Sequence, residues 1–355
     1  MLEIEKEEFT INQANGKPVS PTWLKSTIIR LGEARFQVGL GGLHSSEKSM
    51  TVVSNKKNVM RNADVASFYP RIIINEELYP EQLGEKFLSV YEGIVTTRLK
   101  AKAEGDKATA ESLKIVINGS FGKFGSKYSK LFASELMLAV TFTGQLSLLM
   151  LIERLEMASI PVVSANTDGV EYFCPRKRVS KALKIIKKWE KLTGFTMDND
   201  EYISLHARDV NNYVAKYKDH VKSKGAYKAL DDMPILKKNP QVPICFTAVR
   251  DFIEHGTKIE KTIRKCKDVA QFTSSCKVQG GGMYNGEKLG ATVRWYYNRS
   301  GTPILRVKPN AQGTHGKVAM TDDCKPMLDL TKKRPKDLDY DWYITYAYRM
   351  LGDLG

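Results

Sequence analysis

The stretch Val162-Val163-Ser164-Ala165-Asn166-Thr167-Asp168-Gly169-Val170-Glu171-Tyr172-Phe173 decides which fold this chain can form. β-branched and aromatic residues flank a short polar reversal, which is typical of a β-hairpin. The reversal carries one carboxylate, Asp168, at its tip. An aspartate in a turn is most often simply solvated, so this stretch alone does not indicate a function.

A second carboxylate follows another strand-like run. Residues 58–66 predict a strand that carries Asp64 near its end, and residues 68–78 predict a turn and a short helix. A third element, the run from Lys114 to Gly122, lies between the two carboxylates in sequence. The chain therefore places two aspartates at strand ends, with a helical segment between them.

That helical segment belongs to a predicted pair of helices. The spacing of apolar residues over 81–104 and 107–121 indicates two helices, and Gly105-Asp106 interrupts them. Because the link is so short, the two helices must be antiparallel.

Three cations fall on this pair. At about 1.5 Å rise per residue, Arg98 and Lys114 both stand roughly 10–12 Å from the link, and Lys102 lies one turn nearer to it. Three cations converging on one groove favour an anionic ligand, and a nucleoside triphosphate suits them because arginine and lysine bind phosphate well. The alternative is a set of solvent-facing charges on an exposed hairpin.

Composition sets the limits on other functions. The chain has 355 residues, 42% of them hydrophobic, which suits a globular protein of two or three packed units. A formal net charge of +15 favours a polyanionic partner, with nucleic acid as the first candidate. No apolar run approaches 18 residues, so we expect no membrane span and no membrane partner. The five cysteines are scattered, which indicates neither zinc nor disulfides and suits a reducing cytosol.

The remaining segments show weaker patterns. The apolar residues over 131–157 predict a long core helix, and residues 179–191 predict an amphipathic helix with a lysine-rich solvent face. Residues 211–225 predict a strand, a basic turn and another strand. Helical signal around 243–268, a strand over 291–297 and a final aromatic-rich helix make up the C-terminal part. The glycine pair Gly41-Gly42 indicates either close approach of a nucleic-acid strand or a bulged turn.

In their order and spacing, the segments around Asp64, Lys114–Gly122 and Asp168 resemble motifs A, B and C of family B DNA polymerases, of a phage or mobile-element type. The resemblance covers about residues 36–227. It implies an α+β right-hand polymerase: a ferredoxin-like palm of antiparallel sheet plus helices, helical-hairpin fingers and a mixed thumb. The implied segments are 1–80 for the N-terminal part and first part of the palm, 81–122 for the fingers, 123–226 for the second part of the palm, and 227–355 for the thumb.

The resemblance also implies the roles of individual residues. Asp64 and Asp168 would be catalytic and, with Val65, would hold two Mg²⁺ ions, for which Mn²⁺ can substitute. Tyr69 would exclude a ribose 2′ hydroxyl, although a buried tyrosine that only fixes the short helix is the alternative. The residues expected to bind the nucleotide are Ser67, Phe68, Tyr69, Arg98, Lys102, Lys114, Asn118 and Phe121. The residues expected to bind DNA are Gly41, Gly42, Thr167, Tyr213, Lys222 and Lys224.

This chain departs from the family pattern at several positions. Asn166 and Gly169 replace an aspartate and a serine around Asp168, Gly119 and Phe121 replace a serine and a tyrosine of motif B, and Asn211 replaces a lysine two residues before Tyr213. These departures motivate an alternative, a non-catalytic DNA-binding subunit derived from a polymerase. A reverse transcriptase is a more distant alternative, because its motif C presents two adjacent aspartates, which this chain lacks.

The expected function is therefore template-directed addition of dNMP to a primer 3′ hydroxyl by a nucleotidyltransferase of a phage or mobile element. Its partners would be primer–template DNA and dNTPs. Only 63 residues precede Asp64, too few for a proofreading exonuclease domain, so proofreading would be absent or supplied by a separate exonuclease subunit. The expected location is the cytoplasm, which is the host cytoplasm for a viral protein.

Overall fold

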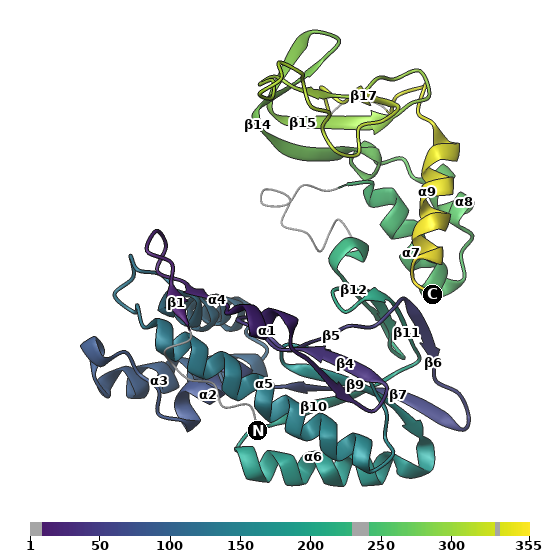
Figure 1. Ribbon diagram of the computed structural model, residues 1–355. Coiled ribbons are helices and arrows are strands. Elements are labelled where there is room, and N and C mark those ends of the chain that lie inside the picture. The colour runs from purple at the N-terminus through teal and green to yellow at the C-terminus, as the bar shows by residue number, and fades with distance from the viewer. Residues whose placement is uncertain (1–8, 229–240, 331–333) are drawn as a thin grey trace. The chain divides into compact units, whose positions relative to one another are not determined.

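The computed structural model describes residues 9–228, 241–330 and 334–355, so short parts of the predicted segments 1–80 and 227–355 lie outside the described residues (Figure 1). The chain forms two compact units. Unit 1 comprises Met1–Glu47 and Val53–Tyr202, and unit 2 comprises Lys48–Val52 and Ile203–Gly355. Both mix helices with antiparallel sheets, as expected from the sequence. The division into palm, fingers and thumb stays a prediction.

Unit 1 is built on a seven-stranded sheet with the strand order β10-β7-β9-β8-β5-β4-β3. Neighbouring strands are antiparallel, and the predicted hairpin is confirmed as β8 and β9, which pair across the turn. The predicted strand carrying Asp64 is confirmed as β7, between β10 and β9. The strands are β3 (Ile28–Leu31), β4 (Ala34–Gln37), β5 (His44–Ser45), β7 (Asn58–Val65), β8 (Val162–Asn166), β9 (Gly169–Pro175) and β10 (Met197–Tyr202). A separate two-stranded ribbon joins β1 (Thr10–Ile11) and β2 (Pro18–Val19).

Side-chain alternation decides which face of this sheet is the core. On β7, Val59, Ala63 and Val65 are buried in the main apolar cluster, together with residues of two long helices. Asp64 therefore lies on the opposite face, because successive side chains of a strand point to opposite sides. The core thus fixes the side of the sheet on which any chemistry of Asp64 must take place.

The helices of unit 1 are α1 (Thr22–Ser26), α2 (Phe68–Asn75), α3 (Lys86–Ala103), α4 (Lys107–Phe124), α5 (Ser134–Met157) and α6 (Val179–Thr193), with short 3₁₀ turns at Glu81–Leu83 and Arg176–Arg178. The predicted antiparallel pair is confirmed as α3 and α4. The expectation of one helix from residue 81 is wrong at its start. Gly84 has φ +63° and ψ −174°, which ends the first 3₁₀ turn before α3 begins.

Helix α5 overturns the expectation that no segment is long and apolar enough to span a membrane. It has 24 residues, and its most apolar 18-residue window has a mean hydropathy of 1.7, with half of that window buried. It carries no charged side chain between Glu135 and Glu153, although polar residues such as Thr141 and Gln145 interrupt its apolar run. A core helix passes the same test of length and composition.

Helix α6 is anchored to α5 by Trp189, which gives a prediction about stability. Trp189 is fully buried, donates its Nε1 hydrogen to the Ser147 carbonyl at 2.8 Å and packs on Phe195. Trp189→Ala is expected to lower the free energy of unfolding by about 3–5 kcal/mol, because it leaves a cavity in the core and removes the hydrogen bond to Ser147. Urea denaturation measures this. Leu192→Ala on the exposed side of α6 is the matched control, expected to change stability by less than ~0.5 kcal/mol; equal effects would contradict the assignment.

Unit 2 contains two four-stranded sheets with the orders β13-β12-β11-β6 and β16-β14-β15-β17. Its strands are β6 (Met50–Val53), β11 (Ser204–Asp209), β12 (Asn212–Lys216), β13 (Val221–Lys224), β14 (Ser274–Tyr284), β15 (Glu287–Tyr297), β16 (Leu305–Arg306) and β17 (Cys324–Pro326). Its helices are α7 (Pro243–His255), α8 (Ile259–Lys265) and α9 (Tyr340–Gly352), with 3₁₀ turns at Gly225–Tyr227 and Val269–Phe272.

One sequence expectation for unit 2 is wrong. Lys222 and Lys224 lie in strand β13 rather than in a basic turn, because the reversal occurs earlier, where the Tyr217 N–H donates to the His220 carbonyl. The glycine-rich run 279–282 is part of strand β14 and carries its register shift. All five cysteines are free thiols.

Candidate active site

In unit 1, Asp64 lies in strand β7 and Asp168 lies in the turn between β8 and β9. Asp64 on β7 is in register with Gly169 on β9, and the Val65 N–H donates to the Asp168 carbonyl at 2.7 Å. The turn that carries Asp168 is therefore tied by its backbone to the end of the strand that carries Asp64. Asp168 is exposed and Asp64 is half-buried.

Gly169 explains how Asp64 fits beside this turn. A Cβ atom built on Gly169 would overlap the Asp64 Oδ1 atom, so any other residue at 169 would displace the carboxylate. The glycine looked like a departure from a serine in the sequence. In the structure it provides the space that the neighbouring aspartate occupies.

Asn62 orients the other oxygen of Asp64. It is buried, lies two residues earlier on β7, and donates its Nδ2 hydrogen to Asp64 Oδ2 at 2.8 Å. Sequence reasoning missed this residue. The signal that could have found it is the two-residue period of a strand, which places Asn62 and Asp64 on one face.

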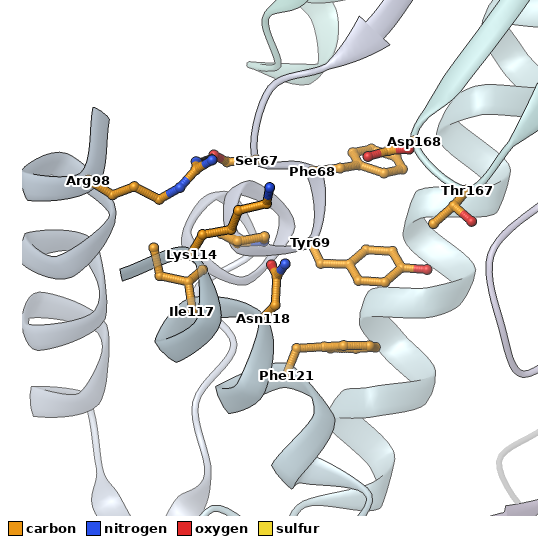
Figure 2. A pocket seen from close by; sticks show the side chains of 11 residues that line it. Ser67, Phe68, Tyr69, Arg98, Lys114, Ile117, Asn118, Phe121, Thr167 and Asp168 are labelled. Carbon is orange, nitrogen blue, oxygen red and sulfur yellow. Dashed lines mark hydrogen bonds between the residues drawn. The ribbon is translucent and has the colours of Figure 1, made fainter. Parts of the chain in front are cut away.

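A pocket of about 390 Å³ lies beside the turn (Figure 2). Seven of the eight residues expected to bind a nucleotide line it, together with Asp168 and Thr167; Lys102 does not. The lining residues are Ser67, Phe68, Tyr69, Pro70, Arg98, Lys114, Ile117, Asn118, Phe121, Thr167 and Asp168. They come from α2, α3, α4 and the β8–β9 turn, which are far apart in sequence.

One side of the pocket is suited to an anion. The Arg98 guanidinium donates to Ser67 Oγ at 2.9 Å, and Lys114 points into the same space (Figure 2). Ser67 has φ +55° at the start of α2, and within the described residues the N–H groups of Ser67, Phe68 and Tyr69 have no acceptor. Free N–H groups at a helix N-terminus next to two cations attract negative charge.

Two details differ from the sequence expectations. The resemblance to family B DNA polymerases also implies that the backbone amides from Val65 to Phe68 face phosphate, but the Val65 and Ala66 N–H groups are already bonded, to the Asp168 and Thr196 carbonyls. Lys102 lies 3.9 Å from the Asp198 carboxylate, an ion pair that joins α3 to β10. Its expected contact with a nucleotide stays a prediction.

The other side of the pocket is aromatic. The Tyr69 and Phe121 rings lie 4.5 Å apart between centroids at 46°, and Tyr69 also stacks on Phe68. Burial, with a smaller contribution from the Asp168 charge, raises the pKa of Tyr69 to about 12. The hydroxyl therefore stays neutral at physiological pH. Helices α3 and α4 are held together beneath this wall by the buried Tyr91 hydroxyl, which donates to the Ile117 carbonyl.

The carboxylates fit a magnesium site by their chemistry. Magnesium binds one or two carboxylates and fills its other positions with water and phosphate oxygens. Asp168 lines the pocket, and Asp64 lies on the strand whose end is tied to the Asp168 backbone, so the two residues supply two such groups. Among the described residues, no cluster of three or more histidine, cysteine, aspartate or glutamate side chains is arranged for a metal.

The residues expected to bind DNA fall into two groups. Gly41, Gly42 and Thr167 lie together in unit 1, where Gly42 packs against Thr167. Tyr213, Lys222 and Lys224 lie on β12 and β13 of unit 2. Lys224 is in register with Tyr213, and its ammonium lies 6.0 Å from the centre of that ring.

The comparisons with known proteins find a similarity among solved structures only. No protein-family model matches the chain, and no curated protein matches it. Among solved structures, the chain is similar to the family B DNA polymerase from the hyperthermophilic archaeon Pyrobaculum calidifontis, with 14% sequence identity and a TM-score of 0.48. The similarity covers 96% of this chain and 48% of that polymerase, so the chain spans about half of that protein's length.

Proposed function

We propose that this protein is a template-directed DNA polymerase that adds dNMP to a primer 3′ hydroxyl. One observation carries the proposal: Asp64 and the turn that presents Asp168 pair in register beside a pocket with a cationic side and an aromatic side. Nucleotidyl transfer needs carboxylates that bind metal ions, a site for the triphosphate and a surface for the base pair, and this pocket would supply all three.

Different residues of the pocket would contact different parts of an incoming dNTP. Arg98, Lys114 and the N-terminus of α2 would bind the triphosphate, because both cations line the pocket. Tyr69 would pack under the sugar and leave no room for a 2′ hydroxyl. Asn118 and Phe121 on α4 would form the wall against the nascent base pair.

Asp64 and Asp168, with the Val65 carbonyl, would hold two Mg²⁺ ions, and Mn²⁺ would substitute for them. When bound, such ions stabilise the charge on the attacking and leaving oxygens of the phosphoryl transfer. The protein contributes by fixing the carboxylates before substrate arrives. Asn62 holds one oxygen of Asp64, and the Val65 N–H holds the backbone of Asp168.

The topology of unit 1 supports a polymerase palm. Apart from α2, α3 and α4, which are inserted between β7 and α5, the chain passes through β7, α5, β8, β9, α6 and β10, and these strands lie in the order β10-β7-β9-β8. This strand–helix–strand–strand–helix–strand arrangement is ferredoxin-like. In the proposed architecture α3 and α4 are the fingers, the C-terminal part is the thumb, and Tyr213, Lys222 and Lys224 contact primer–template DNA.

Lys114 provides a test of the triphosphate site. Its ammonium is half exposed, pairs with Glu111 at 3.5 Å and lines the pocket. Lys114→Ala is expected to raise the KM for dNTP about 10- to 30-fold, because one charge-assisted contact to phosphate is lost. Steady-state primer extension measures this. Lys100→Ala is the matched control on the facing helix, because Lys100 is exposed and does not line the pocket. A larger effect at Lys100 would mean that the triphosphate binds elsewhere on the hairpin.

The function itself is tested by extension of a primed DNA template with dNTPs or rNTPs in Mg²⁺ or Mn²⁺. Template-dependent extension with dNTPs is expected. A protein that binds primed DNA in a salt-dependent way, yet extends no primer in either metal, would instead be the non-catalytic subunit considered above.

A further inference from the structure

A buried glutamine on α5 organises the glycine-containing loop from Gly39 to Gly42. Gln145 is 1% exposed in the middle of an apolar helix. Its Oε1 accepts from the Gly39 N–H at 3.1 Å, and its Nε2 donates to the Gly39 carbonyl at 2.7 Å and to the Gly41 carbonyl at 2.5 Å. The whole side-chain amide is used to hold this one loop.

These bonds also fix the direction of the loop's free N–H groups. The described peptide bonds are all trans, so each carbonyl points opposite to the N–H of the following residue. Because the Gly39 and Gly41 carbonyls face Gln145, the N–H groups of Leu40 and Gly42 point away from it. Within the described residues neither N–H has a hydrogen-bond acceptor. A Cβ placed on Gly39 or Gly41 would meet nothing within 4 Å, so the loop surface is open.

The loop is joined directly to the turn that carries Asp168. The Thr167 N–H donates to the Leu43 carbonyl at 2.7 Å, and a Cβ on Gly42 would come within 2.7 Å of Thr167 Cγ2. The loop residues do not line the nucleotide pocket. The N–H groups of Leu40 and Gly42 are thus available to an anionic group other than the nucleotide, close to the turn that carries Asp168.

We infer that Gln145 is a positioning residue that sets this loop to hold one backbone phosphate of the bound primer–template through the N–H groups of Leu40 and Gly42. This inference rests on the proposed function, because DNA is the polyanion that would lie beside Asp168. Backbone N–H groups bind phosphate strongly when they are already aligned, since no side chain must be ordered. Gln145 supplies that alignment from the core.

The test measures DNA binding separately from catalysis. Gln145→Leu removes all three bonds with little change in volume, and Thr141→Val, one turn earlier on α5, is the control, because Thr141 is equally buried and its hydroxyl has no partner. We expect Gln145→Leu to raise the Kd for primed DNA, measured by fluorescence anisotropy, roughly tenfold, and to leave kcat at saturating DNA and the KM for dNTP within about twofold. Thr141→Val should bind DNA like the wild type.

A scan of methylphosphonate substitutions along both DNA strands identifies the phosphate. Neutralising one phosphate should weaken binding by the wild type roughly tenfold and should weaken binding by Gln145→Leu no further. Equal sensitivity of both proteins at every position would overturn the inference, as would unchanged DNA affinity in Gln145→Leu. If Gln145→Leu does not fold, Gln145→Met, which is also close to glutamine in volume and also lacks the amide, should give the same loss. DNA binding with this phosphate signature but without extension would refute the polymerase proposal alone; absence of DNA binding by the wild type would refute both.

Discussion

Replacing Asp168 with asparagine is expected to reduce primer extension at least ~1,000-fold while leaving the affinity for primed DNA within about twofold. The substitution keeps the size of the side chain and removes the charge that would hold a divalent ion. A bound metal ion stabilises the transition state of phosphoryl transfer by several kcal/mol, and each ~1.36 kcal/mol changes the rate tenfold. Single-turnover extension with saturating dNTP measures the rate, and fluorescence anisotropy measures binding. Asp64→Asn should behave in the same way.

Asp200→Asn is the matched control for this prediction. Asp200 is exposed on β10, the strand that pairs with β7, and it is in register with Asn62 rather than with Asp64. It does not line the pocket, so its loss should change extension less than about twofold. If Asp168→Asn retained activity, or if the Asp200 variant lost as much, the assignment of the metal-binding carboxylates would fail.

Local patterns were enough to predict the elements that carry the site. The β8–β9 hairpin follows from β-branched runs around a polar turn, and the α3–α4 pair follows from helical periodicity broken at Gly105-Asp106. The rise per residue of a helix was enough to predict that Arg98 and Lys114 lie at a similar distance from the link between α3 and α4. Both residues line the pocket. Each of these features depends on residues close together in sequence.

Features that depend on contacts between distant segments could not be predicted. Gly169 looked like a lost serine until β7 and β9 were paired, because only their register brings Asp64 over it. The same holds for Gln145, which lies about a hundred residues from the loop that it binds. In sequence it is only a polar residue in an apolar helix. Lys102 is another example, because its partner Asp198 lies on strand β10, and the geometry of helix α3 alone cannot predict where that strand lies.

Replacing Tyr69 with valine is expected to reduce the preference for dNTP over rNTP about 100-fold. The Tyr69 ring is held between Phe68 and Phe121 at the aromatic side of the pocket, so it cannot turn away to admit a 2′ hydroxyl. Valine shortens the side chain and opens that space, and steric discrimination at one atom is worth about 10- to 200-fold. The ratio of kcat/KM for dCTP and CTP on the same primed template measures the preference.

Tyr69→Phe separates the ring from its hydroxyl. If the ring itself excludes the 2′ hydroxyl, the phenylalanine variant should keep most of the preference, and the wild-type preference should not change between pH 7 and pH 9. The second expectation follows from the sign of the pKa shift: burial and the Asp168 charge raise the pKa of Tyr69 to about 12, so the hydroxyl remains protonated throughout this range. A preference that survives in Tyr69→Val would assign sugar selection to another residue. A loss in both variants would mean that the hydroxyl, not the ring, makes the selective contact.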